Sequence, residues 1–302
     1  MIYRKEEDTV NSYIDNSMGL TEEEISINLS SLKNDMKSKR YKEALAGYRA
    51  LAQIGVTDAE KEYAIILEKG QLVPKNLDLA MKYFYHAALK NDVYSAYRYS
   101  RLVARTNEDI GKFWLIYSAV LGCNAAYPAA AEEFSREGYE EDALYFTRLA
   151  ADCDDADSIV AAAKRYYDGV GAEASPEYAK WYMDKLKIPP IYAIKLAYKL
   201  RRVVAKEPPP ITLQGYDGLL RKLAAKAKEH SFDKAYHKLT EMLTARGDTT
   251  AEVELAVLLL DGHGCKQNIT EALKLLTKSA AIGSIRANLA LGDLHFDERL
   301  FP

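Results

Sequence analysis

The sequence predicts an all-α protein, a right-handed superhelical α/α solenoid built from helix pairs. Three observations lead to this fold class. Small and apolar residues recur with helical spacing at a nearly constant period along the chain. Two such patterns alternate, so that the repeating unit contains two different helices. The chain of 302 residues is 48% hydrophobic, which is ample for a buried core.

The first pattern has small or apolar residues at offsets 0, 3, 7, 8 and 11, as in Ala272, Leu275, Ser279, Ala280 and Gly283. Its other copies start at Ala44, Ala80, Gly111 and Ala143, and more loosely at Ala179 and Ala235. These offsets lie on one face of an α-helix, and the small residues at 7 and 8 allow another helix to approach. Gly or Asn at offset 11 favours a left-handed end to the helix.

The second pattern occupies the segments between these copies. It has offsets 0, 4, 5, 8 and 11, as in Ala251, Leu255, Ala256, Leu259 and Gly262. Further copies start at Ala59, Ala126 and Ser158, and Glu137 replaces the final Gly in the copy from Ala126. Each unit is therefore predicted to be a first helix with this second pattern, a loop, and an antiparallel second helix with the pattern of Ala272. We expect about seven such pairs.

Residues 1–40 are predicted to be a capping region for the stack. Thr21 and Glu24 form a capping-box pattern, which predicts a helix from about Glu22. This helix should pair with the helix at 41–54 and cover the end of a repeat stack over residues 41–205. Stacked repeats need such ends because each unit buries its face only against its neighbours.

The period breaks once, at residues 206–218, where the sequence reads KEPPPITLQGYDG. Three consecutive prolines favour stiff, extended backbone. We interpret the segment as a joint between two stacks; a tolerated surface insertion is the alternative. Helices are predicted on both sides, in 188–206 and 218–247, the latter as a hairpin turning at His230-Ser231. Residues 219–302 should hold this hairpin and one more repeat.

The repeat resembles a known family. The pattern A-x₃-LG-x₂-Y-x₂-G-x-GV followed by A-x₂-W-x₃-AA-x₂-G-x₃-A is similar to the Sel-one-like repeat, a relative of the tetratricopeptide repeat. Residues 163–182 and 255–287 carry the resemblance most clearly. It covers roughly 41–205 and 248–302. The loops at 103–109 and 134–138 depart from it, because they are short. The resemblance implies an adaptor that holds peptides or domains of other proteins in an extended groove without a cofactor.

Charge is distributed unevenly along the chain, although the net charge is only −3. Residues 106–157 hold 12 acidic and 3 basic side chains, whereas residues 179–240 hold 14 basic and 5 acidic ones. Such asymmetry can orient a partner or support self-association between copies of the chain. The alternative is a solvated surface with patchy charge. No global basic excess indicates a nucleic-acid ligand.

The cysteines and the apolar segments bear on location. Three Cys, far apart and odd in number, argue against a disulfide framework and favour a reducing compartment. The first 20 residues contain no apolar signal-peptide core, and no apolar run approaches 18 residues. We therefore expect a cytoplasmic protein that has no membrane partner, and the family resemblance adds the expectation of a bacterial type.

Candidates for chemistry are few. His263 and Cys265 are two residues apart, but a zinc site needs about four ligands and no second pair exists. The acidic runs at 132–143 and 152–158 have the composition of solvated surfaces, since acid–base catalysis requires a desolvated carboxyl group. The Gly-containing DGVG and DGHG segments lack the Lys-Ser/Thr of a phosphate loop. We expect no catalytic residue, metal ligand or cofactor, and hence no enzyme.

The better candidate for function is the inner, concave face of the first helices. Offsets 2, 3, 6 and 9 are free of core residues there, and the chain holds 22 Tyr, more than a core needs. Tyr and Arg contribute strongly to protein interfaces. The predicted partner-binding residues are Tyr97, Arg98, Arg101, Glu132, Ser135, Lys164, Tyr167, Lys195, Lys199 and Arg202. The alternative is that these are ordinary surface side chains.

The favoured function is therefore a non-enzymatic scaffold or adaptor that binds a partner protein or peptide in the concave groove. An alternative is an inhibitor or immunity protein that neutralises a toxin or enzyme, with residues 132–157 as an acidic plug. Nucleic-acid binding through the basic region 195–238 is less favoured.

Overall fold

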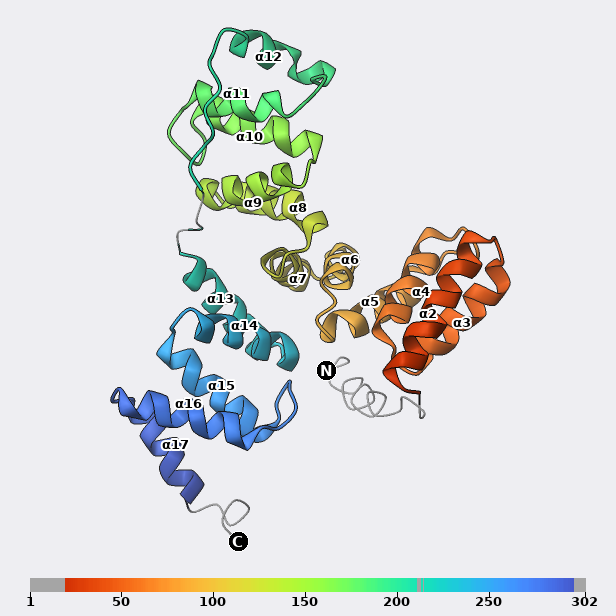
Figure 1. Cartoon of the computed structure of the whole chain (residues 1–302), viewed down its shortest axis with the longest axis vertical. Coiled ribbons are helices and arrows are strands. Elements are labelled where there is room, and N and C mark those ends of the chain that lie inside the picture. Colours follow the sequence, from red (N-terminus) through yellow and green to blue (C-terminus); the bar gives the residue numbers. More distant parts are fainter. Residues whose placement is uncertain (1–19, 211–212, 214, 296–302) are drawn as a thin grey trace. The chain divides into compact units, whose positions relative to one another are not determined.

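A computed structural model describes residues 20–210, 213 and 215–295, and Figure 1 shows the chain. Within these residues every regular element is a helix: 16 α-helices and two 3₁₀ helices. In this part of the chain, no helix has both the length and the apolar character needed to cross a bilayer. The chain divides into two compact units, Met1–Gln214 and Gly215–Pro302, and each has its own arrangement of helices.

Unit 1 consists of five helical hairpins followed by a single helix (Figure 1). The hairpins are α2 (Glu22–Lys37) with α3 (Tyr41–Gln53), α4 (Thr57–Lys69) with α5 (Leu77–Leu89), α6 (Val93–Val103) with α7 (Glu108–Val120), α8 (Tyr127–Arg136) with α9 (Glu140–Asp152), and α10 (Ala156–Asp168) with α11 (Pro176–Asp184). The single helix is α12 (Ile194–Leu200), which follows a 3₁₀ turn at Ile191–Ala193. A second 3₁₀ turn, Asn124–Ala126, precedes α8. Each hairpin packs on the next, so the predicted α/α solenoid is confirmed.

Unit 2 repeats the same plan. Helix α13 (Tyr216–Glu229) pairs with α14 (Asp233–Ala245), and α15 (Thr249–Asp261) pairs with α16 (Ile269–Ala281). Helix α17 (Ile285–His295) packs on α16 as a further first helix. With the five hairpins of unit 1, the described residues contain seven hairpins, as the two sequence patterns predict.

The helix ends explain why the two patterns recur. Gly70, Gly169 and Gly262 each end a first helix in the left-handed conformation, at offset 11 of their pattern. Offset 11 of the second helices is also left-handed, at Gly55, Asn91, Gly122, Asp154 and Gly283. The N-terminal capping box is present too, with Thr21 and Glu24 bonded reciprocally. These local signals reverse the chain at regular intervals, and the hairpins follow from them.

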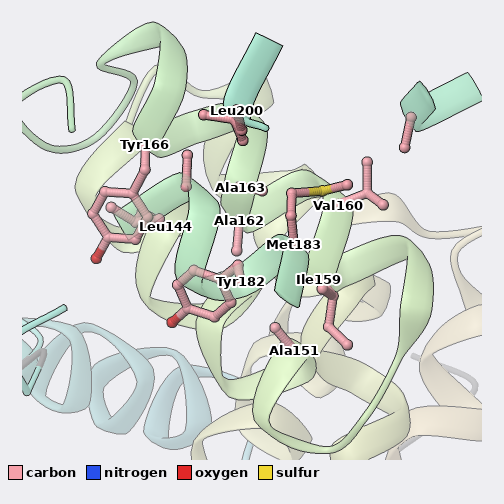
Figure 2. Packing of buried hydrophobic residues seen from close by; sticks show 12 residues of the cluster. Leu144, Ala151, Ile159, Val160, Ala162, Ala163, Tyr166, Tyr182, Met183 and Leu200 are labelled. Atoms are coloured by element: carbon pink, nitrogen blue, oxygen red, sulfur yellow. The ribbon is translucent and has the colours of Figure 1, made fainter. Parts of the chain in front are cut away.

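The core lies between consecutive helices, and its buried side chains are mostly alanine and leucine, with tyrosine next in frequency. Figure 2 shows the cluster around α10, where Ala162 and Ala163 lie fully buried beside Tyr166 and Tyr182. The small residues allow the neighbouring helices to approach, and the tyrosine rings fill the space between them. A separate cluster of buried residues lies in unit 2, with Ala272 and Leu276 fully buried.

The segment after α11 differs from its prediction. A helix was expected through 188–206, but α12 spans only Ile194–Leu200, and the chain is extended from Val204. No second helix pairs with α12 in the described residues, so the alternation of first and second helices slips by one, as expected. The turn between α13 and α14 lies at His230-Ser231, where Ser231 has a φ of 56°. The division between the units falls inside 206–218.

Candidate protein-binding surfaces

The predicted partner-binding residues lie on four first helices, α6, α8, α10 and α12, and in the turn after α12. Most of them are accessible. Those that are exposed are Arg101, Glu132, Lys164, Lys195, Lys199 and Arg202, and those that are half-buried are Tyr97, Arg98, Ser135 and Tyr167. The structure does not gather them into a single pocket; instead, they fall into three groups.

The group on α6 is partly structural. Arg98 forms an ion pair with Glu68 of α4, the preceding first helix. Burial alone would lower the pKa of Arg98, but its hydrogen bond to Glu68 and the charge of that carboxylate raise the pKa above its ordinary value. Its guanidinium therefore links two repeat units. Arg101 is more available, since its side chain is exposed; its Nη1 donates a hydrogen bond to the Tyr97 hydroxyl, at 3.2 Å.

The second group lies in a groove of about 660 Å³ between α8 and α10, with α9 beneath. Its lining combines small residues with charged ones: Pro128, Ala131, Glu132, Ser135, Arg136, Thr147, Asp155, Asp157, Ser158, Ala161 and Arg165. The small side chains leave room for a ligand chain. The two arginines are held by carboxylates of the protein, Arg136 by Glu133 and Arg165 by Glu140.

The electrostatics of this groove are acidic. The hydrogen bond from Arg165 to Glu140, 2.7 Å long, lowers the pKa of that carboxyl group, which also accepts a bond from Ser135 Oγ at 3.0 Å. Glu132, Asp155 and Asp157 remain exposed around the groove. The groove between α8 and α10, called the acidic groove below, is thus suited to a positively charged segment.

The third group forms a basic patch on α10 and α12. The Lys199 ammonium lies 5.0 Å from the centre of the Tyr167 ring, so a residue of α12 is brought onto a residue of α10. Lys164 and Lys195 are exposed nearby on the same two helices. The surface that carries the predicted residues therefore changes from acidic at α8–α10 to basic and aromatic at α10–α12.

A further groove, in unit 2, was missed by the sequence reasoning. It has a volume of about 530 Å³ and includes two exposed apolar side chains, Val257 and Leu289. At its edge the Tyr236 hydroxyl donates a hydrogen bond to Glu254, at 3.0 Å, and burial together with that carboxylate raises the pKa of Tyr236 to about 12. The offset rule used for the other first helices, applied to α15, would have predicted Glu254 and Val257.

Another unpredicted residue is Arg148 of α9, which is 8% exposed. Its Nε donates to the Tyr182 hydroxyl at 2.8 Å, its Nη1 to the Tyr166 hydroxyl at 2.9 Å, and its Nη2 to the backbone oxygen of Pro209 at 2.9 Å. These bonds hold the extended Pro-rich segment against the helices of unit 1. No local pattern could reveal this, because the partners are 18 to 61 residues away in sequence.

The loop with His263 and Cys265 has a clear packing role. Burial raises the pKa of the Cys265 thiol, which lies 3.5 Å from the backbone oxygen of Leu258. Gly264 approaches the start of α14 so closely that a Cβ there would lie 2.2 Å from the Asp233 oxygen. His263 lines the groove of unit 2. Among the residues that the structure describes, no group of three or more His, Cys, Asp and Glu side chains could hold a metal ion.

Comparisons with known proteins identify the repeat. A family model for the Sel1 repeat matches residues 57–92, 156–186 and 249–284, which are the hairpins α4/α5, α10/α11 and α15/α16. The chain therefore contains three Sel1 repeats, and the predicted resemblance is confirmed. Among curated proteins, none matches the sequence significantly.

Two solved structures are similar in fold. One is a protective antigen of uropathogenic Escherichia coli with an SLR fold, at 15% identity and a TM-score of 0.49; the match covers 90% of this chain and 72% of that one. The other is a Sel1 repeat protein from Oxalobacter formigenes, at 16% identity and a TM-score of 0.43, over 95% of this chain and 89% of that one.

Proposed function

We propose that this chain, a Sel1-like repeat protein, is a non-enzymatic scaffold or adaptor that binds a segment of a partner protein along the inner face of its first helices. Sel1 repeat proteins generally mediate interactions between proteins. The observation that carries the proposal is the acidic groove, since it is open, has a floor of small residues and bears exposed carboxylates. The three free thiols are compatible with the cytoplasmic location expected from the sequence.

The chemistry of the partner segment follows from the two charged surfaces of unit 1. Lys or Arg side chains would face Glu132 and Asp155, and acidic side chains would face Lys164, Lys195 and Lys199 of the basic patch. Exposed charges of this kind contribute more to encounter rate and orientation than to affinity. The expected ligand is therefore a segment of mixed charge whose basic and acidic parts are separated along its length.

A charge swap tests this assignment. The variant Glu132→Lys/Lys164→Glu reverses one charge on each surface and leaves the net charge of the chain unchanged. The matched control, Glu43→Lys/Lys82→Glu, does the same at exposed positions on second helices. Affinity purification with wild type and both variants, followed by mass spectrometry, should recover a partner with wild type and the control and lose it with the groove variant. Equal recovery by all three would rule out the groove.

The acidic groove also supports the alternative of an inhibitor that plugs a cationic active site. This alternative predicts a single tight 1:1 complex, whereas an adaptor combines with more than one protein. Light scattering of the purified complex distinguishes them by mass. Binding of nucleic acid through the basic region 195–238 would instead appear as retention of DNA or RNA in a low-salt filter assay, and this retention would weaken steeply with added salt.

A further inference from the structure

Helix α12 is half of a repeat unit. Every earlier first helix of unit 1 is followed by a second helix that packs against it, but the chain after Leu200 turns at Arg201–Val203 and becomes extended. The side of α12 that faces the preceding hairpin is packed as in the other first helices. Ala193 and Leu200 are buried there in one cluster with residues of α10 and α11. The side on which a second helix would pack has no such helix in the described residues.

Comparison of equivalent positions identifies the uncovered face. Counting from the first core residue of each first helix, offsets 1, 5 and 8 are buried in α4, α8 and α10, where a second helix follows. The residues at these offsets are Glu60, Ala64, Leu67, Tyr127, Ala131, Phe134, Ile159, Ala163 and Tyr166. In α12, counted from Ala193, the same offsets are Ile194, Tyr198 and Arg201, and all three are exposed. Ile194 is 51% exposed and Tyr198 is 63% exposed.

The extended segment that follows α12 does not fill this place. It runs back along unit 1, where the Lys206 amide donates to the Glu177 oxygen at 3.2 Å and Arg148 holds Pro209. Val204, at the start of the segment, is 82% exposed. The chain is therefore tied to α9 and α11 and leaves the outer face of α12 open.

The open face has the chemistry of a helix-binding groove. Ile191, Ile194 and Tyr198 are spaced three and four residues apart, so their side chains form one apolar row. Ile191 is 88% exposed. The Arg201 guanidinium lies 3.6 Å from the centre of the Tyr198 ring and ends the row with a positive charge. Lys195 and Lys199 flank it, and none of the carboxylates in the described residues forms an ion pair with these three cations.

We propose that this face, the open slot of α12, binds an amphipathic helix of a partner protein, which takes the place of the missing second helix. The apolar side of that helix would cover Ile191, Ile194 and Tyr198, and acidic residues at its margin would pair with Arg201, Lys195 and Lys199. In helix-in-groove recognition, apolar side chains at helical spacing on the bound helix pack into the apolar surface of the groove. The slot contains no residue of the acidic groove, but it shares Lys195 and Lys199 with the basic patch and so rests in part on the function proposed for that patch. The slot variant described below changes only Ile194 and Tyr198, so its result is distinct from that of the charge swap at Glu132 and Lys164.

The chain supplies a suitable probe, because α9 is an acidic second helix. A stapled, fluorescein-labelled peptide copying residues 139–155, with Cys153→Ser, presents the second-helix pattern together with Glu140, Glu141 and Asp142. Its binding is measured by fluorescence anisotropy to the full chain, to the slot variant Ile194→Ser/Tyr198→Ser, and to the control variant Ile27→Ser/Ile282→Ser. The control residues are as exposed as those of the slot, at 61% and 64%, and circular dichroism confirms the fold of each variant.

Saturable binding to wild type and the control, weakened by about tenfold or more in the slot variant, is the expected result. A second peptide, with Glu140, Glu141 and Asp142 replaced by Lys, should bind more weakly than the first. Equal binding to both protein variants, no binding to wild type, or preference for the lysine peptide would overturn the proposal. So would binding of the full chain to phosphatidylglycerol vesicles but not to the acidic peptide, because that outcome assigns the slot to a membrane surface.

Discussion

At the scale of single residues, the second glycine of each Gly-x-Gly loop joins neighbouring units. Gly171, with a φ of 79°, lies so close to the start of α9 that a Cβ would be 2.1 Å from the Glu140 oxygen. Gly264 stands in the same relation to Asp233 at the start of α14. The first glycine of the loop ends a helix, whereas the second allows backbone to touch backbone between repeats.

We expect Gly171→Ala to destabilise unit 1 much more than Gly138→Ala. Gly138 has a similar φ of 83°, but nothing lies within 4 Å of its missing Cβ. Both substitutions carry the cost of a left-handed alanine, about 1–2 kcal/mol. Gly171→Ala adds roughly 1–3 kcal/mol for the displaced backbone. Urea unfolding followed by tryptophan fluorescence measures both, and equal losses would contradict the contact with Glu140.

His86 predicts a dependence of stability on pH. Burial, with the ammonium groups of Lys82 and Lys90, lowers its pKa to about 4, although the Glu60 carboxylate lies 3.8 Å from Nδ1. The unfolded chain takes up a proton near the ordinary pKa of 6.5 while the folded protein does not, so stability falls as the pH drops from about 6.5 towards 4. Between about pH 7 and pH 5 this loss amounts to about 2 kcal/mol.

The variant His86→Gln should remove this contribution, so that its free energy of unfolding falls less on acidification than that of wild type. Urea titrations at the two pH values give the comparison. His230→Gln, at the C-terminal end of α13 in unit 2, serves as a control. Parallel pH dependence in wild type and His86→Gln would show that His86 is protonated alike in the folded and unfolded chains.

At the scale of elements, similar helical hairpins form from segments that match the repeat pattern well and from segments that match it poorly. The family model matches α4/α5, α10/α11 and α15/α16, whose first helices all end in a left-handed glycine followed by a long loop. The hairpins α6/α7 and α8/α9 have short turns instead, at 104–107 and 137–139. In α7, α8 and α9 the small residues recur at the offsets of the two patterns, and it is this spacing that predicts these three helices.

Arg148 is the main side-chain anchor of the Pro-rich segment, and the backbone bond from Lys206 to Glu177 is a second contact. We expect Arg148→Met to release it, since the bond to Pro209 is lost and the Tyr166 and Tyr182 hydroxyls lose a buried donor, at about 1–3 kcal/mol for each unsatisfied group. Hydrogen exchange at the amides of residues 205–207 should become faster. Arg136→Met, which removes only an exposed ion pair with Glu133, should leave that exchange unchanged. Unchanged exchange in both variants would show that Arg148 does not anchor the segment.

The elements also show what could be predicted from sequence. Local signals sufficed for the capping box at Thr21 and for the turn at Ser231, because each depends on neighbours within a few residues. They failed at the end of α12, where the helical pattern continues but the chain is drawn away by contacts to α9 and α11. The groove prediction also treated Arg98 as accessible. In the folded chain Arg98 forms an ion pair with Glu68, which is distant in sequence, and no local pattern predicts this pair.

At the scale of the whole molecule, each of the two units has its own cluster of buried apolar residues. The cluster that includes Leu144 belongs to unit 1, and the cluster that includes Leu276 belongs to unit 2. Both tryptophans, Trp114 and Trp181, lie in unit 1. Tryptophan fluorescence therefore reports the unfolding of unit 1 alone, whereas circular dichroism reports the helices of both units.

If residues 206–218 act as a joint, the units should unfold independently. Leu276→Ala and Leu144→Ala each empty a fully buried site, at a cost of about 2–5 kcal/mol. Leu144→Ala should lower the urea midpoint of tryptophan fluorescence. Leu276→Ala should leave that midpoint in place and shift only part of the circular dichroism transition, because the cavity lies in the other core. A fluorescence midpoint that moves equally in both variants would mean that the two stacks unfold as one cooperative body and that the Pro-rich segment transmits stability between them.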